Sequence, residues 1–425
     1  MQLIKNLKYD FPSSLAVFLV ALPLCLGIAL ASGAPLLSGL VSGVIGGIVV
    51  GLISGSHTSV SGPAAGLATI VLASITQLGG FEVFSVALLL AGAFQIAAGL
   101  FKIGVIANYI PSNVIKGLLA AIGILLILKQ VPHALGYDVD HEDIFAFTQP
   151  NGENTFSHLL NSYQYMTTGA VIISTVSILI IVLWEKTTLR KLRYVPSSLV
   201  VVIIGILFNK AFEVLFPALY VSGHHLVSIP SLTILELFNF KLPSLAAFSN
   251  YNVWMVALTV AIVASIETLL NLEAVDSIDP HKRESPPNKE LVAQGIGNMV
   301  AGIVGGLPVT SVIVRGSVNV NSGAQSKLSA ILHGAFLLIS VLLIGSFLNM
   351  IPLASLAAIL IMTGYKLANT SLFKEMYYKG WNQLIPFGAT ILSIVLTDLL
   401  TGILIGLAVS TFYLLKSNYK NPFIL

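Results

Sequence analysis

The chain has 425 residues, of which 56% are hydrophobic and only 9% are charged, and its formal net charge is +3. Soluble globular proteins carry roughly 25% charged residues, so this composition excludes a soluble protein and indicates a polytopic membrane protein with repeated runs of spanning length. The small net charge does not favour nucleic-acid binding, and the single cysteine, Cys25, excludes an internal disulfide.

Fourteen apolar segments follow one another along the chain and predict an all-α polytopic membrane protein. They are residues 12–31, 36–54, 63–78, 83–101, 113–131, 166–184, 196–212, 252–271, 290–304, 309–320, 328–348, 353–367, 382–397 and 400–416. The first is too long for the apolar part of a signal peptide and leads directly into the second, so we interpret it as a retained helix. The stretches at about 132–165 and 213–250 are predicted external loops.

The third and tenth segments differ from the others. They read "SGPAAGLATIVLASI" and "LPVTSVIVRGSV", and both are short and open with Pro and Gly. Irregular backbone at membrane depth must be buried in protein or line a cavity, so these two segments are predicted to be broken half-helices. They lie seven segments apart, which divides the chain into two inverted repeats of seven spans, about 10–212 and 250–417. Paired interruptions of this kind indicate a transporter's binding site.

A candidate anion site follows from the two interruptions. If the half-helix of the tenth segment begins near Val309, its N-terminus faces the bilayer centre, and Thr310 and Ser311 offer free N–H groups, hydroxyls and a positive dipole end. Arg315 adds a positive charge, and ionisable residues inside spans are functional by default. The alternative is that Arg315 reaches an interface or pairs structurally with a carboxylate. The third segment offers a second helix start, where Pro63 is a natural first-turn residue, at Gly62, Pro63, Ala64 and Ala65.

Glu267, in the eighth segment, is the second unusual charge. It could bind a coupled cation, Na⁺ or H⁺, beside the anion, or it could neutralise Arg315. A plain interfacial carboxylate at the end of a helix is the third possibility. Asn271 follows at i+4 on the same helix face.

Other chemistry is not indicated by the sequence. It has no nucleotide-binding G-x-x-x-x-G-K-[ST] loop, no H-E-x-x-H motif and no Cys/His cluster. We therefore expect no enzyme activity, no cofactor and no bound metal other than Na⁺ at Glu267. His224 and His225 lie in an external loop without a carboxylate at ligand spacing, so we expect them to be solvated.

Lysine and arginine residues predict the orientation. If the N-terminus is cytoplasmic, fourteen crossings place nearly all of the loop Lys and Arg inside, and only Lys129, Lys210 and Lys241 fall at the outer side. Because cytoplasmic loops carry an excess of Lys and Arg, both termini are predicted to be cytoplasmic. We expect the membrane to be a bacterial plasma membrane.

The sequence resembles the sulfate-permease (SulP) family of anion transporters over essentially its whole length. The resemblance is most specific in "SIETLLNLEAVDSIDPHKRESPPNKELVAQGIGNMVAGIVGGLPVTSVIVRGSVNVNSGAQSKLSAILHG", and "SVSGPAAG" and "TDLLTGILIGL" are similar too. It implies a seven-plus-seven inverted repeat with a core and a gate domain, and substrate between the starts of the third and tenth helices. Members usually form dimers and end in a cytoplasmic STAS domain, and we expect no STAS domain within these 425 residues, because the last predicted span reaches residue 416.

The resemblance also assigns roles to individual residues. Glu267 matches the acidic position of the eighth helix, which is linked to Na⁺ in related bicarbonate transporters, and Arg315 matches the basic residue just past the substrate position. Asn271 stands where bicarbonate-type members can have threonine.

The expected function is secondary active transport of a small inorganic anion, sulfate or bicarbonate, coupled to H⁺ or Na⁺. Core and gate would move against each other to give alternating access. The alternatives are an organic-anion or nucleobase-type permease, which would not need Arg315, and an uncoupled anion channel.

Overall fold

A computed structural model describes residues 6–138, 147, 154–187, 196–227, 245–343 and 345–420. Part of each predicted external loop, including Lys241, therefore lies outside the described residues. The main helices are α2 (Leu7–Ala31), α3 (Leu36–Ile45), α4 (Gly51–Ile53), α5 (Ala68–Leu78), α6 (Phe81–Leu100), α7 (Ser112–Leu135), α8 (Thr155–Gln164), α9 (Thr168–Lys186), α10 (Ser197–Leu215), α12 (Tyr251–Ile278), α13 (Pro287–Val304), α14 (Ile313–Asn321), α15 (Leu328–Leu343), α16 (Gly345–Leu348), α17 (Leu353–Leu367), α18 (Thr370–Tyr378), α19 (Trp381–Leu396) and α20 (Leu399–Lys420).

The predicted apolar segments coincide with these helices. Among the described residues nine helical stretches are long and apolar enough to span a membrane, and three shorter apolar helices cover 65–78, 328–340 and 381–396. The two remaining predicted segments are α13, which contains polar residues, and the short α14. The protein is thus an integral membrane protein built almost entirely of helices.

The two interrupted segments meet as a small sheet, which the all-α prediction does not include. Strand β1 (Ser61–Pro63) pairs antiparallel with β2 (Val309–Ser311), and Gly62 faces Thr310 in the register. The half-helix of the tenth segment therefore begins at Ile313 and not near Val309. Pro63 likewise ends a strand and does not open a helix. Pairing gives backbone polar groups of both extended segments partners within the protein.

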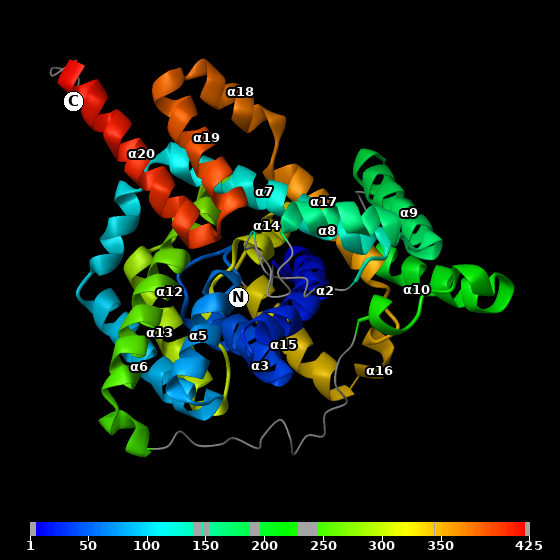
Figure 1. The fold of residues 1–425 in the computed structure, drawn as a ribbon, viewed down its shortest axis with the longest axis horizontal. Coiled ribbons are helices and arrows are strands. Elements are labelled where there is room, and N and C mark those ends of the chain that lie inside the picture. The colour runs from blue at the N-terminus through cyan, green and yellow to red at the C-terminus, as the bar shows by residue number, and fades with distance from the viewer. Residues whose placement is uncertain are drawn as a thin grey trace.

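Figure 1 shows how the helices surround this sheet. Helices α6, α12 and α13 pack together on one side, whereas α7, α17, α19 and α20 form another packed group. Helix α2 lies near the centre and is buried along most of its length. It contacts α3, α14 and α15, so the first helix supports the region in which the two strands meet.

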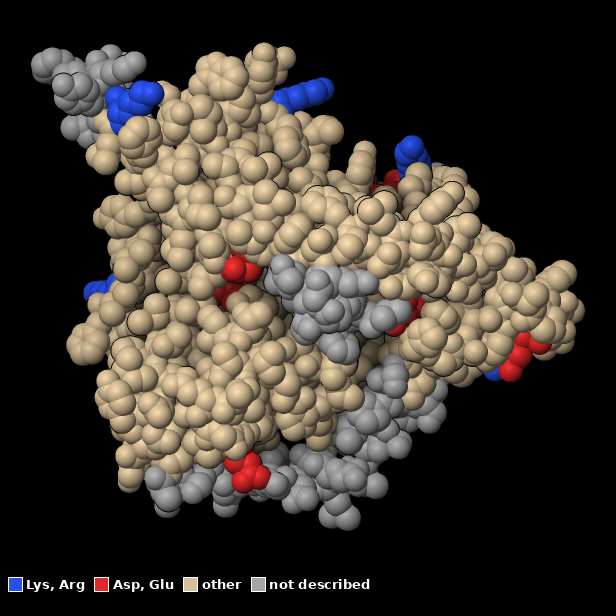
Figure 2. Space-filling view, viewed as in Figure 1, with Lys and Arg blue, Asp and Glu red and all other residues tan. Residues whose placement is uncertain are grey.

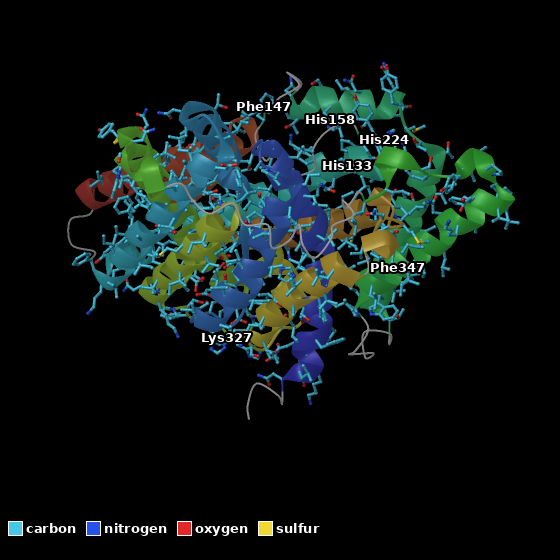
Figure 3. All side chains as sticks on the ribbon, turned by 90° about the horizontal axis from the view of Figure 1, so that it is seen from below. His133, Phe147, His158, His224, Lys327 and Phe347 are labelled. Carbon is cyan, nitrogen blue, oxygen red and sulfur yellow. The ribbon has the colours of Figure 1, made fainter. Side chains whose placement is uncertain are left out.

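The labelled side chains locate the two ends of the molecule. In Figure 3 the N-terminal end and Lys327 lie at one end, and His133, His158 and His224 lie toward the opposite end. The face seen in Figure 2 carries isolated acidic side chains, and its Lys and Arg appear only near the rim.

Candidate functional site

The strand crossing is held by side chains of α12 and α13. Asn298 binds both backbone polar groups of Val309: its Oδ1 accepts from the N–H at 2.6 Å, and its Nδ2 donates to the C=O at 3.0 Å. Asn271 Nδ2 donates to the Ser311 carbonyl at 2.7 Å, and the Ser311 N–H donates to the Thr268 hydroxyl at 3.4 Å. Strand β2 is therefore fixed by side chains of the two helices that come directly before it in the chain.

Strand β1 has its own support. Gln294 Nε2 donates to the Ser61 hydroxyl at 2.6 Å and to Glu290 Oε1 at 2.9 Å. The hydroxyls of Ser59 and Ser311 lie 2.7 Å apart and join the two sides of the crossing. These buried polar groups are hydrogen-bonded, as burial at this depth requires.

The structure changes which backbone donors are free. The N–H groups of Val309 and Ser311 are already used by Asn298 and Thr268, and Thr310 pairs with Gly62. The free N–H groups lie instead in the first turn of α14, which begins directly after β2. The first N–H groups of a helix have no carbonyl one turn earlier to accept their hydrogen bonds. The Thr310 hydroxyl is buried and has no hydrogen-bond partner.

The predicted residues of the third segment lie opposite β2. Gly62 and Pro63 belong to β1, and the Ala64 N–H donates to the Pro308 carbonyl at 3.0 Å. Ala65 starts a 3₁₀ turn, Ala65–Leu67, that leads into α5. The starts of the third and tenth helices are therefore adjacent, as the pairing of their strands requires.

Arg315 lies at the crossing and is fully buried, with 0% of its surface exposed. Its Nη2 lies 3.1 Å from Cys25 Sγ, while Nε and Nη1 have no hydrogen-bond partner in the part of the chain that the structure describes. The guanidinium lies against Gly62, where a Cβ atom would be only 2.1 Å from Nη1. Burial excludes the interfacial alternative, and no described carboxylate forms an ion pair with Arg315. A buried charge without a partner is costly, so this position favours a nearby anion.

Glu267 occupies a different part of the site. It is 8% exposed and accepts a backbone hydrogen bond from Gly66, and its Oε2 has no partner. Asn271 Oδ1 is also buried without a partner. Both residues line a cavity of about 10 Å³, roughly enough for one water molecule, whose walls also include Gly66, Val263, Leu270, Leu399, Leu400 and Ile403. Glu267 therefore does not neutralise Arg315 directly.

A larger cavity, of about 650 Å³, opens between other helices. It is bounded by α2 and α14 on one side and by α9, α10 and α17 on the other. Glu185 and Lys366, which form an ion pair, lie in its wall. The residues that line it include Tyr9, Lys186, Ser197, Asn321, Ser322 and Thr363.

The expectation of solvated loop histidines is wrong for His225. Its Nδ1 lies 2.5 Å from Asp138 Oδ2, and His133 Nδ1 lies 2.6 Å from Asp138 Oδ1. Burial raises the pKa of Asp138, but the hydrogen bonds with His133 and His225 outweigh it, so this pKa lies below its usual value. The carboxylate comes from a distant loop, so spacing along the sequence could not reveal it.

The sequence analysis also missed the residues that hold the strands, Thr268, Gln294 and Asn298. A signal was present: Gln294 and Asn298 are neutral polar residues at i and i+4 in an apolar segment, and Gln95 is a polar amide in another. Polar side chains inside spans need partners because lipid offers none.

Comparisons with known proteins identify the family of the chain. Residues 7–409 match the sulfate permease family. Similar relatives include the putative sulfate transporter YvdB of Bacillus subtilis, which is 29% identical over 97% of this chain and 74% of its own length. The bicarbonate transporter BicA of Picosynechococcus is 29% identical over 96% of this chain and 70% of its own length.

Solved structures give the same result for the fold. The transmembrane domain of a cyanobacterium bicarbonate transporter BicA superposes with a TM-score of 0.62 and 26% identity, covering 96% of this chain and 97% of that one. Murine Slc26a9, an anion transporter in the inward-facing state, gives a TM-score of 0.66 at 18% identity over 96% of this chain and 68% of its own. The paired strands, the half-helices after them and the family match lead to one conclusion: the chain belongs to the sulfate permease family.

Proposed function

We propose that the protein transports a small inorganic anion, sulfate or bicarbonate, across the membrane, and that a gradient of H⁺ or Na⁺ drives the transport. The observation that carries the proposal is the fully buried guanidinium of Arg315, which lies at the strand crossing and has no carboxylate partner among the described residues. The relatives that support it are named as sulfate and bicarbonate transporters.

The anion would bind where β1 and β2 give way to helices. The first-turn N–H groups of α14 and the Thr310 hydroxyl would donate hydrogen bonds to it, and the helix dipoles would favour its charge. Arg315 lies behind Gly62, so it would act mainly through its electric field. Gly62, Pro63, Ala64 and Ala65 would form the opposite wall, and Val309 and Ser311 would shape the strand.

The coupled cation would bind at Glu267. The unpartnered oxygens Glu267 Oε2 and Asn271 Oδ1 line the same small cavity. Oxygen ligands suit a hard cation such as Na⁺, and a carboxylate in this position can alternatively carry a proton. A cation there would offset the negative charge of Glu267 beside the incoming anion.

Alternating access would arise from movement of the group formed by α6, α12 and α13 against the group formed by α7, α17, α19 and α20. Leu399, Leu400 and Ile403 of α20 cover Glu267 on one side. Elsewhere in the molecule, the cavity of about 650 Å³ separates α2 and α14 from α9, α10 and α17. We expect the larger cavity to face the cytoplasm together with both termini, and we expect a homodimer in a bacterial plasma membrane.

The test is uptake of labelled sulfate and labelled bicarbonate into proteoliposomes, with and without imposed Na⁺ and proton gradients. Uptake of either anion that a cation gradient accelerates supports the proposal. Anion flux that no cation gradient changes would indicate an uncoupled channel. Transport of neither anion would contradict the proposal and favour an organic-anion or nucleobase substrate.

A further inference from the structure

One hydrogen-bonded chain outside the substrate-facing residues runs from β2 to α6 and α12. Asn298 Nδ2, which donates to the Val309 carbonyl, also donates to Gln95 Oε1 at 2.6 Å. Gln95 Nε2 in turn lies 3.3 Å from the hydroxyl oxygen of Ser265, which accepts its hydrogen bond. Asn298 is 0% exposed and Gln95 is 1% exposed, so no water competes for these groups.

The contact depends on a very close approach of two helices. A Cβ atom on Gly92 would lie 2.5 Å from the Gly295 carbonyl oxygen, and one on Gly295 would lie 2.7 Å from the Gly92 carbonyl oxygen. Only glycine fits at both positions. Gln95 and Asn298 each follow one of these glycines by one turn, so the close packing of α6 and α13 (Figure 1) brings their side chains together.

The direction of the Asn298 amide decides whether it can hold β2. Its oxygen must face the Val309 N–H, and its nitrogen must face the Val309 carbonyl. The Ser265 hydroxyl donates to the Ala261 carbonyl at 2.6 Å, so its oxygen is left to accept from Gln95 Nε2. This turns Gln95 Oε1 toward Asn298, where it can accept only from the amide nitrogen. Gln95 therefore fixes the orientation in which Asn298 binds both groups of the strand.

We propose that Gln95 and Asn298 are positioning residues for the anion site. They do not touch the anion but hold β2 against β1, so that Thr310 and the first turn of α14 stay in place. The inference rests on the proposed anion site. It assigns Gln95 a role in anion affinity that is separate from the cation site at Glu267.

The experiment replaces Gln95 by methionine, which has a similar shape but offers Asn298 only a weakly accepting sulfur in place of the amide oxygen. The concentration of labelled sulfate or bicarbonate at half-maximal uptake should rise at least 5-fold, while the Na⁺ or H⁺ concentration that gives half-maximal stimulation stays within 2-fold of wild type. Ser85→Ala is the matched control, because the Ser85 hydroxyl is buried on the same helix and donates only within it, to the Phe81 carbonyl.

The outcomes separate the two proposals. If wild-type protein takes up neither anion, the proposed function fails. If wild-type protein transports and folded Gln95→Met has unchanged anion affinity, or if its anion and cation constants worsen together, the positioning role is wrong. If Gln95→Met does not fold, Asn298→Asp replaces it, since aspartate has the same shape but loses both donated hydrogen bonds. Unchanged anion affinity in Asn298→Asp would equally overturn the inference.

Discussion

Gly62→Ala tests most directly whether the close contact between Gly62 of β1 and the Arg315 guanidinium determines anion affinity. The added Cβ would lie 2.1 Å from Nη1, 2.6 Å from Cζ and 3.2 Å from Nη2 of Arg315. Ordinary contacts between such atoms are about 3.5 Å or longer, so the guanidinium must move by more than 1 Å. That movement would also break its contact with Cys25.

The expected cost follows from overpacking a buried site. Forcing extra methyl groups into packed interiors costs about 1–3 kcal/mol, which corresponds to roughly a 5- to 150-fold weakening if it appears in anion affinity. The assay is uptake of the labelled anion over a range of concentrations, together with thermal unfolding of the purified protein. Gly388→Ala is the control, because a Cβ there meets nothing within 4 Å.

A double-mutant cycle identifies the cause. The three nearest atoms to the added Cβ all belong to Arg315, so Gly62→Ala should add little further loss when Arg315 is already alanine. If the glycine substitution costs the same in both backgrounds, or costs nothing in the wild type, the close contact does not determine the site and the reasoning is refuted.

The remaining predictions concern the three charged groups. Arg315→Gln should weaken sulfate or bicarbonate uptake at least tenfold without abolishing folding, since it removes the unpaired positive charge, and unchanged affinity would remove Arg315 from the site. Glu267→Gln should abolish stimulation by Na⁺ or proton gradients more than it weakens anion binding; gradient responses equal to those of wild type would end the coupling role. Asp138, whose pKa is lowered below its usual 3.8, contributes stability that is present above pH 3.8 and lost as the pH falls through the lowered value. Asp138→Asn should therefore lower the free energy of unfolding at pH 7 by about 1–3 kcal/mol, and the variant should lose less stability than wild type on acidification. Thermal unfolding at pH 7 and at pH 3 measures both effects, and the same change of stability with pH in both proteins would contradict the prediction.

Much of the architecture follows from local sequence, because hydrophobicity and helix breaking are local properties. The fourteen apolar segments correspond to helices, and the Pro and Gly residues near Pro63 and Pro308 mark where two of them are interrupted. Arg315 and Glu267 stand out for the same reason, since a charge inside an apolar run is conspicuous without any knowledge of its neighbours.

The tertiary structure decided how those local features combine. Only the pairing of β1 with β2 shows that the two interrupted segments hydrogen-bond to each other through their backbones. As a result α14 begins at Ile313, and backbone N–H groups that we expected to be free, such as that of Ser311, already have acceptors. Only the packing shows that Arg315 lies behind Gly62 while Glu267 lies beside Gly66.

The partners of Asn298 and Asp138 were equally hidden in the sequence. Asn298 meets Gln95, and Asp138 meets His225, across long stretches of chain. A hydrogen bond needs two groups within about 3 Å, and that proximity is created by the packing of distant helices and loops. The sequence by itself thus determined the membrane-spanning class and the unusual residues, and the tertiary structure determined which polar groups meet and which remain available to an anion or a cation.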